Sequence, residues 1–256
     1  MPRLVERSAP GDAFGRTARE YELGRPEWPV ELIDRVISEC GIAADATVLD
    51  LGAGTGKLTR VLVTRFQRVV AVEPDDEMRA VLEEVVPDAD ALAGEGEAIP
   101  LADGSVDSVF SGEAFHWFAT RDTVAEVERV LRPGGVFVFL WNIFERHLEP
   151  ELGEASRLIS EAFARGGRPG QSRVVSGEWR QAFEGSGFGP IHEDELVRDV
   201  ATDRERWLAN IVSVSSIAAQ PAKARTQLTN RLRELAPADA EYRRRFRTVA
   251  YWTRLG

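Results

Sequence analysis

The chain has 256 residues, and its 32 Lys and Arg against 42 Asp and Glu give a formal net charge of -10. With 43% hydrophobic and 29% charged residues, it has the composition of a folded globular protein, so wholesale disorder is excluded. The acidic balance argues against nucleic acid as a partner, because phosphate backbones bind positive surfaces. Cys40 is the only cysteine, and no signal-like or membrane-length apolar segment is found, so we expect a cytoplasmic protein.

The first part of the chain alternates between predicted helices and short predicted strands. A helix is predicted over Pro26–Cys40, and a strand over Thr47–Leu49 ends at Asp50. After a glycine-rich turn and a helix to Phe66, the further elements are strand Arg68–Val72, a helix from Pro74 to Val85, strands Ala89–Ala93 and Ser105–Ser111, helix Val124–Leu131 and strand Val136–Trp141. This alternation is typical of an α/β protein with a parallel sheet and helices on both faces.

Beyond residue 145 the pattern loosens, and the elements are predicted at helices Glu151–Arg165, Glu178–Gly185, Arg204–Asn210 and Ala224–Leu235 and at strands Ile191–Val200 and Phe246–Trp252. Arg165–Ser176 is rich in Gly, Arg and Ser and is expected to be a mobile loop or hinge. Within one domain, 1–256, we expect a sheet core at 27–145, lid and substrate-side elements with one strand at 146–240, and a closing strand at 241–256. Residues 223–256 carry nine basic and three acidic residues, which we interpret as a solvated helix face.

The first strand leads into a loop with three alternating glycines, Asp50-Leu51-Gly52-Ala53-Gly54-Thr55-Gly56-Lys57. Such glycines let the backbone turn sharply and let a ligand approach its N–H groups. A Walker A phosphate loop requires Ser or Thr after the Lys, where this chain has Leu58. The dinucleotide pattern requires a third Gly where this chain has Lys57 or Thr59, although one-residue variants keep that alternative open. Asp50, at the strand end, suits a cationic ligand.

This loop resembles motif I of the class I S-adenosylmethionine-dependent methyltransferases, whose cofactor carries a sulfonium and an ammonium but no phosphate. The resemblance implies a Rossmann-like, seven-stranded, mostly parallel sheet with a C-terminal helical lid. It also implies that the cofactor is S-adenosyl-L-methionine and that the loop binds it through Asp50, Gly52, Ala53, Gly54 and Gly56. The alternative for the loop is a tight turn in any α/β fold.

The second strand ends at Glu73, 21 residues after Gly52, where a carboxylate can accept two hydrogen bonds from a ribose diol. Asp75 is placed to cap the next helix, which leaves Glu73, with Pro74 beside it, for the cofactor. Met78, one helical turn further on, either covers an adenine face or packs in the core.

The segment Gly94-Glu95-Gly96-Glu97-Ala98-Ile99-Pro100 resembles a loop of small-molecule members of the same family. The resemblance implies that Glu95 contacts the adenine amino group and that the Gly96 N–H meets an adenine ring nitrogen, with Glu97 in the same loop. The family usually has Asp at the position of Glu95. The alternative is a surface loop with scattered acidic residues.

Two later segments, Ser111-Gly112-Glu113-Ala114-Phe115-His116-Trp117-Phe118 and Glu128–Gly135, resemble the branch that contains the trans-aconitate methyltransferases. The N-terminal run Phe14–Tyr21, with Arg25-Pro26, resembles the same branch. In relatives this N-terminal segment folds over the cofactor, so Tyr21 and Arg25 are expected to cover the cofactor or meet the substrate.

Methyl transfer requires alignment, exclusion of water and, for a protonated acceptor, a base. The catalytic candidates are His116, as a base or an orienting residue, and Glu113, as a base or a partner of the cofactor's ammonium. We expect Phe115, His116, Trp117 and Trp141 to line the substrate pocket, although core packing is the alternative for each aromatic residue. The three histidines show no metal-ligand spacing, so no metal is expected.

The sequence therefore predicts methyl transfer from S-adenosylmethionine to a small-molecule acceptor, on the oxygen of a carboxylate or a hydroxyl. Three alternatives remain. One is a nucleotide-dependent oxidoreductase that binds NAD, and another is a non-catalytic module that binds S-adenosylmethionine. The third, RNA or protein methylation, is disfavoured by the net charge.

Overall fold

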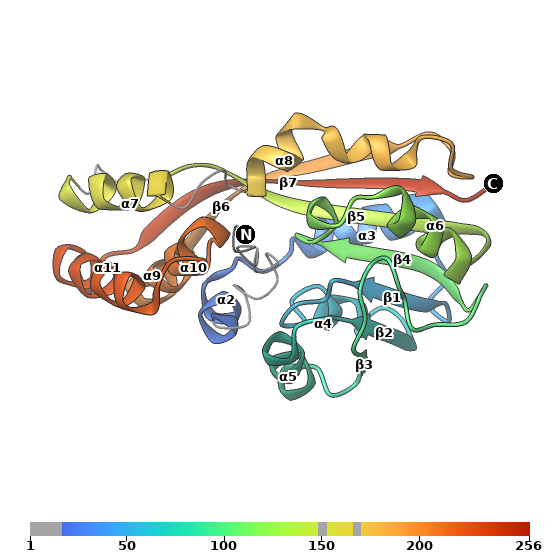
Figure 1. The fold of residues 1–256 in the computed structure, drawn as a ribbon, viewed down its shortest axis with the longest axis horizontal. Helices are drawn as coiled ribbons and strands as arrows, with labels where there is room; N and C mark the ends of the chain where they lie inside the picture. The colour runs from blue at the N-terminus through green and yellow to red at the C-terminus, as the bar shows by residue number, and fades with distance from the viewer. Residues whose placement is uncertain (1–16, 148–152, 166–169) are drawn as a thin grey trace, which may run out of the picture.

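The computed structural model describes residues 17–147, 153–165 and 170–256 (Figure 1). Its framework is a seven-stranded sheet with the order β3-β2-β1-β4-β5-β7-β6. Five strands are parallel: β1 (Thr47–Leu51), β2 (Arg68–Val72), β3 (Asp90–Leu92), β4 (Val106–Gly112) and β5 (Leu131–His147). Strand β7 (Tyr242–Arg254) runs antiparallel to both β5 and β6 (His192–Thr202). The predicted mostly parallel α/β sheet is confirmed.

Helices cover both faces of the sheet because successive strand residues point to opposite sides. Val138 of β5 packs with α3 (Val30–Cys40) and α4 (Thr59–Leu62). The next residue, Phe139, packs with α6 (Arg121–Val130) and the 3₁₀ segment η2 (Glu178–Phe183) on the other face. Helix α5 (Asp76–Val85) packs beside β2 through Leu82, which is fully buried.

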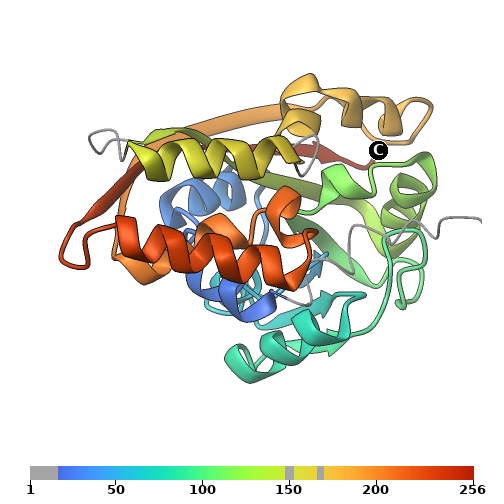
Figure 2. The ribbon, with the colours of Figure 1, turned by 60° about the vertical axis from the view of Figure 1, so that its left-hand side comes forward.

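The long ends of β5, β6 and β7 extend past the parallel strands and carry a separate helical layer (Figure 1). Its helices are α7 (Glu154–Arg165), α9 (Arg204–Val212), α10 (Ser215–Ala218) and α11 (Ala222–Leu235). They share an apolar cluster in which the rings of Trp207 and Tyr242 stack at 4.8 Å. Figure 2 shows α7 and α11 lying side by side in this layer.

Helix α2 (Ala18–Gly24), which sequence periodicity did not predict, joins this layer by packing on α9. The contact is so close that a Cβ atom on Gly24 would lie 2.1 Å from the Asn210 backbone nitrogen. The N-terminal segment is therefore fixed against the helices that follow the sheet.

Several predicted boundaries are wrong. The helix predicted to reach Leu131 ends at Val130, and the strand predicted over Val136–Trp141 extends from Leu131 to His147 because Leu131 pairs with β4 and β7 pairs with β5 as far as His147. Of the predicted mobile loop, Arg165 ends α7, residues 166–169 lie outside the described part, and helix α8 (Gly170–Ser176) occupies the remainder. Val174 of α8 buries its side chain in the main core, which explains the helix.

The solvated helix face predicted for the basic segment 223–256 is wrong for five of its nine basic residues, which lie in β7 and include the arginine run, whereas the other four lie in α11. Arg245 pairs with Asp199 of β6 at 2.6 Å, and Arg247 pairs with Glu195 at 2.9 Å. These cross-strand ion pairs balance part of the local positive charge. No helix within the described residues is long and apolar enough to cross a membrane.

Candidate active site

A cavity of about 850 Å³ lies at the carboxyl ends of β1, β2, β4 and β5, beneath α2 and α9. Open α/β sheets bind ligands at this edge. One half of the cavity is bounded by the glycine loop, the residues after β2 and the Gly94–Glu97 loop. The other half is bounded by the end of β5 and by side chains of the helical layer.

The glycine loop begins at the end of β1 with two residues in the left-handed region, Gly52 at φ 72° and Gly54 at φ 58°. A Cβ atom on Gly52 would also lie 2.6 Å from the Ala114 Cβ, whereas a Cβ on Gly54 would meet no atom within 4 Å. The loop thus presents an open backbone surface at Gly54, as the sequence predicted for a ligand-binding turn.

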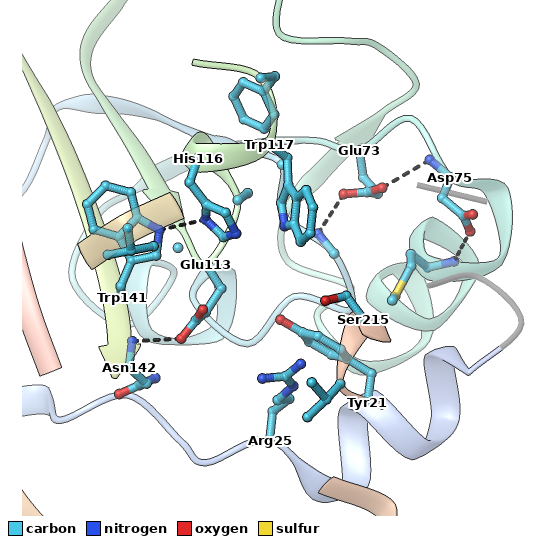
Figure 3. Close-up of a pocket in the computed structure, with 18 of the residues that line it drawn as sticks. Tyr21, Arg25, Glu73, Asp75, Glu113, His116, Trp117, Trp141, Asn142 and Ser215 are labelled. Atoms are coloured by element: carbon cyan, nitrogen blue, oxygen red, sulfur yellow. Dashed lines mark hydrogen bonds between the residues drawn. The ribbon is translucent and has the colours of Figure 1, made fainter. Parts of the chain in front are cut away.

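Glu73 connects this loop to α5, because its Oε2 accepts from the Gly54 N–H at 2.8 Å and its Oε1 accepts from the Asp75 N–H at 3.0 Å. Burial raises the pKa of Glu73, and these backbone donors partly oppose the rise. Asp75 caps α5 by accepting from the N–H groups of Glu77 and Met78, as predicted. Pro74 and Met78 line the cavity beside Glu73 (Figure 3).

Three of the loop residues predicted to bind the cofactor do not line the main cavity. Asp50 is fully buried below the loop, where its Oδ2 accepts from the Thr59 hydroxyl at 2.6 Å, and burial raises its pKa to about 7. Gly56 lies further along the turn, and Ala53 lines only a small adjoining pocket of about 40 Å³. Direct contact of Asp50 with a cation in the cavity is therefore wrong, because its side chain points into the core beneath the turn.

The Gly94–Glu97 loop contributes Glu95, Gly96 and Glu97 to the same half of the cavity. Gly96 is buried, while the side chains of Glu95 and Glu97 are exposed. The loop is fixed by the Glu126 carboxylate, which accepts from the Ile99 N–H at 2.9 Å. The loop that the sequence assigned to the adenine therefore lines the cavity.

Helix α2 brings Tyr21 and Arg25 over the cavity (Figure 3). The Arg25 guanidinium lies 4.9 Å from the Tyr21 ring centre and donates to the Ser213 carbonyl at 3.2 Å. Burial raises the pKa of Tyr21 to about 12, so its phenol stays neutral. Glu22 fastens α2 to the glycine loop by accepting from the Thr55 hydroxyl at 2.7 Å. Tyr21 and Arg25 therefore line the cavity, while residues 14–16 of the predicted covering segment lie outside the described residues.

Glu113 follows β4 and adopts φ 58°, the only left-handed non-glycine residue among those described. Its Oε1 accepts from the Asn142 N–H at 2.6 Å, which directs the carboxyl group toward the middle of the cavity (Figure 3). Burial raises the pKa of Glu113, and the charge of Arg25 opposes the rise. A strained residue held by the neighbouring strand is typical of functional sites.

His116 and Trp117 belong to the short 3₁₀ segment η1 (Phe115–Trp117), and both line the cavity. The Trp141 indole N–H donates to His116 Nδ1 at 2.9 Å, and both side chains are buried. Phe115, predicted to line the pocket, is instead fully buried in the aromatic core against Phe137 and Phe139. A 3₁₀ turn points successive side chains in different directions, so the three residues cannot all face one space.

Sequence reasoning missed most of the apolar half of the cavity, which is lined by Ile143, Phe144, Ile159, Phe163, Ile211 and Phe246. Val214 and Ser215 also line the cavity, whereas Ser213 and Ser216 are buried outside it. No motif marks these positions, and their helical periodicity is equally consistent with core packing.

The charges in the glycine-loop half fit a cationic ligand better than a phosphate. Its acidic lining residues are Glu73, Asp75, Glu95, Glu97 and Glu113, and among the described residues the arginines that line the whole cavity are Arg25 and Arg244. Lys57 reaches only the small adjoining pocket, where it pairs with Glu27 at 2.6 Å. A pyrophosphate would face this excess of carboxylates, whereas a sulfonium and an ammonium are attracted by it. Among the described residues, no cluster of metal-ligating side chains is present.

Comparison with known proteins agrees with this geometry. Residues 49–139 match the model of the family described as "Methyltransferase domain". An uncharacterised methyltransferase of Mycobacterium tuberculosis (strain ATCC 25618 / H37Rv) is 38% identical over 87% of this chain and 85% of its own. A malonyl-[acyl-carrier protein] O-methyltransferase of Geobacter sulfurreducens is 29% identical over 87% of this chain and 86% of its own.

Among solved structures, a candidate type II methyltransferase of Anaeromyxobacter dehalogenans superimposes on this protein with a TM-score of 0.66. The two sequences are 25% identical, and the match covers 90% of this chain and 97% of the other chain. The expected trans-aconitate branch is not distinguished by these relatives. The glycine loop, the acidic cofactor half of the cavity and the extent of the likeness together place the chain in the family of S-adenosylmethionine-dependent methyltransferases, with S-adenosylmethionine as its cofactor.

Proposed function

We propose that this methyltransferase acts on an oxygen atom of a small-molecule acceptor. The observation that carries the proposal is the two-part cavity, in which an acidic half built on the glycine loop joins an apolar half under the helical layer. Small-molecule sites are typically enclosed, mostly apolar and provided with a few placed polar groups. A volume of about 850 Å³ suits two molecules of moderate size side by side.

In this proposal Glu73 binds the ribose hydroxyls, and the Glu95 side chain with the Gly96 N–H binds the adenine edge, which Met78 covers. Glu113 faces the ammonium end, and Tyr21 and Arg25 close the site from α2. When bound, the cofactor supplies a methyl group on a positively charged sulfur. The residues of the chain hold the acceptor in line with that methyl group and exclude water.

Oxygen is favoured because the relative from Geobacter sulfurreducens is named as an O-methyltransferase and is similar along most of the chain. A small acceptor is favoured over nucleic acid because the cavity is lined by acidic side chains, and because Arg245 and Arg247 already pair with carboxylates of β6. We also propose that the protein acts in the cytoplasm, which agrees with its single, buried cysteine.

The test combines binding with transfer. Calorimetry with S-adenosylmethionine, S-adenosylhomocysteine and NAD should show micromolar binding of the first two and none of the third. The Gly54→Arg variant, whose side chain would enter the open space at that turn, should lose this binding. Methyl-labelled cofactor is then offered with a panel of carboxylic acids, alcohols and amines, and with RNA as a control. Transfer only to amines or RNA would contradict the proposal.

A further inference from the structure

The protonation state of His116 is set by its neighbour. An indole N–H can only donate, so the 2.9 Å contact with Trp141 requires a lone pair on His116 Nδ1. A neutral imidazole with a lone pair on Nδ1 carries its hydrogen on Nε2. Burial, together with the nearby charges of Arg173 and Arg25, lowers the pKa of His116 to about 3, so the ring stays neutral at physiological pH.

His116 Nε2–H is a buried donor without a partner among the described residues. The side chain is only 7% exposed, yet the residue lines the cavity. Figure 3 shows the ring between Trp141 and Trp117, above Glu113, with the Trp141 contact on one edge and the other edge toward the open space. A buried donor without an acceptor destabilises the protein, so a bound ligand that accepts from it removes that cost.

The charged groups around His116 favour a negatively charged acceptor for this hydrogen bond. Arg25 reaches the cavity from α2, and Arg173 approaches from α8, with its guanidinium 5.1 Å from the Trp117 ring centre. Glu113 lies below the His116 ring in Figure 3, and one of its carboxylate oxygens is held by the Asn142 N–H. The cavity is otherwise lined mostly by apolar side chains such as Ile143 and Phe246, together with the buried Arg244.

Resting on the proposed function, we infer that His116 is a positioning residue whose Nε2–H donates to the carboxylate of an acceptor with an apolar body. His116 does not remove a proton in this assignment, since its only lone pair is bound by Trp141. A carboxylate needs no base because it is already ionised at neutral pH. One carboxylate oxygen forms a bond to the methyl carbon as the carbon–sulfur bond breaks. The electron pair of the broken bond stays on sulfur, and no proton moves.

The tautomer is tested directly by ¹⁵N NMR of the imidazole side chains, of which the chain has three. We expect one histidine, assigned through His116→Gln, to show the Nε2–H tautomer without titration between pH 5 and 8. In Trp141→Phe, which removes the donor to Nδ1, this signal should shift toward a mixture of tautomers. A protonated Nδ1 in the wild type, or titration of His116 in that range, would overturn the assignment without reference to activity.

The positioning role is tested with two variants in which an amide side chain, which cannot act as a base, replaces His116. The amide nitrogen of His116→Gln can reach the Nε2 position, whereas that of His116→Asn lies nearer the Nδ1 position. With sodium octanoate as the acceptor probe, we expect His116→Gln to keep kcat/KM within about fivefold of wild type. His116→Asn should lose about 10–100-fold, mainly through KM, as for a lost hydrogen bond to a charged group. Cofactor binding by calorimetry, unchanged in both, shows that the variants are folded.

The matched probe 1-octanol separates failure of this inference from failure of the proposed function. We expect labelling of octanoate and none of 1-octanol. Labelling of 1-octanol in preference to octanoate, or equal inactivity of the Gln and Asn variants, would overturn the positioning role while oxygen methylation stands. Transfer only to amines would contradict oxygen methylation, while the NMR result would still decide the state of His116.

Discussion

The buried carboxyl of Asp50 makes the stability of this protein depend on pH in a direction that can be tested. Its Oδ2 accepts from the Thr59 hydroxyl, and its Oδ1 is buried without a partner among the described residues. Desolvation, with a further contribution from the charge of Glu73, raises the pKa of Asp50 to about 7. The neutral acid is therefore the form that the folded protein prefers.

The size of the effect follows from linkage. Because the pKa of Asp50 is higher in the folded state than in the unfolded state, its stabilising contribution is fully present below pH 4 and is lost as pH rises toward 7. The change from 3.8 to about 7 corresponds to about 4 kcal/mol. Asp50→Asn imitates the neutral acid in shape and cannot ionise. The variant should therefore gain up to about 4 kcal/mol relative to wild type between pH 4.5 and 8.

The measurement is urea denaturation of both proteins at several pH values, with the difference in unfolding free energy plotted against pH. Asp45→Asn, which removes an exposed carboxylate near the start of β1, controls for the loss of one negative charge. The same samples should bind S-adenosylmethionine within about threefold of wild type, because Asp50 does not line the cavity. A difference curve for Asp50→Asn that is as flat as that of the control would refute the reasoning.

Three other substitutions test the geometry of the site. In Glu73→Gln an amide NH2 group replaces one of the two carboxylate oxygens, each of which accepts a backbone N–H group. Two donors would then face each other, so cofactor affinity measured by calorimetry should fall at least about tenfold. Gly54→Ala should lower the free energy of unfolding, measured by urea denaturation, by about 1 kcal/mol, because alanine is strained in the left-handed backbone conformation. Gly52→Ala should lower it by at least about 1 kcal/mol more, because the new Cβ would also clash with Ala114. Gly24→Ala should detach α2 from α9 and so weaken cofactor binding and expose α2 to limited proteolysis.

Each of these substitutions has its own control. Glu77→Gln, on the exposed side of α5, should leave cofactor affinity unchanged and so separate the role of Glu73 from loss of charge. Leu23→Ala, in the same helix as Gly24 but 46% exposed, should leave α2 resistant to protease. Equal costs for the two loop alanines, or a proteolysis pattern of Gly24→Ala like that of Leu23→Ala, would contradict the packing described above.

The cofactor half of the site was predicted from sequence because it depends on local backbone geometry. Glycines after a strand, an acidic residue after the next strand and a capping Asp75 act within a few residues of their positions, and the structure places Gly54, Glu73 and Asp75 in contact. Asp50 was misplaced because the direction of its side chain depends on which residues pack below the loop. Phe115 was misplaced for the same reason, since the 3₁₀ turn that rotates it away is fixed by the aromatic core.

By itself the sequence determined the α/β alternation and the mostly parallel sheet, which follow from periodicity, and its motifs indicated the cofactor through their resemblance to a known family. Only the tertiary structure decided the apolar half of the cavity and the state of His116. Ile159, Ile211 and Phe246 lie in different elements and meet at the cavity through the long strands β5 and β7. The pairing of His116 with Trp141 likewise joins residues on separate elements. Such contacts depend on how distant segments pack, and no local pattern records them.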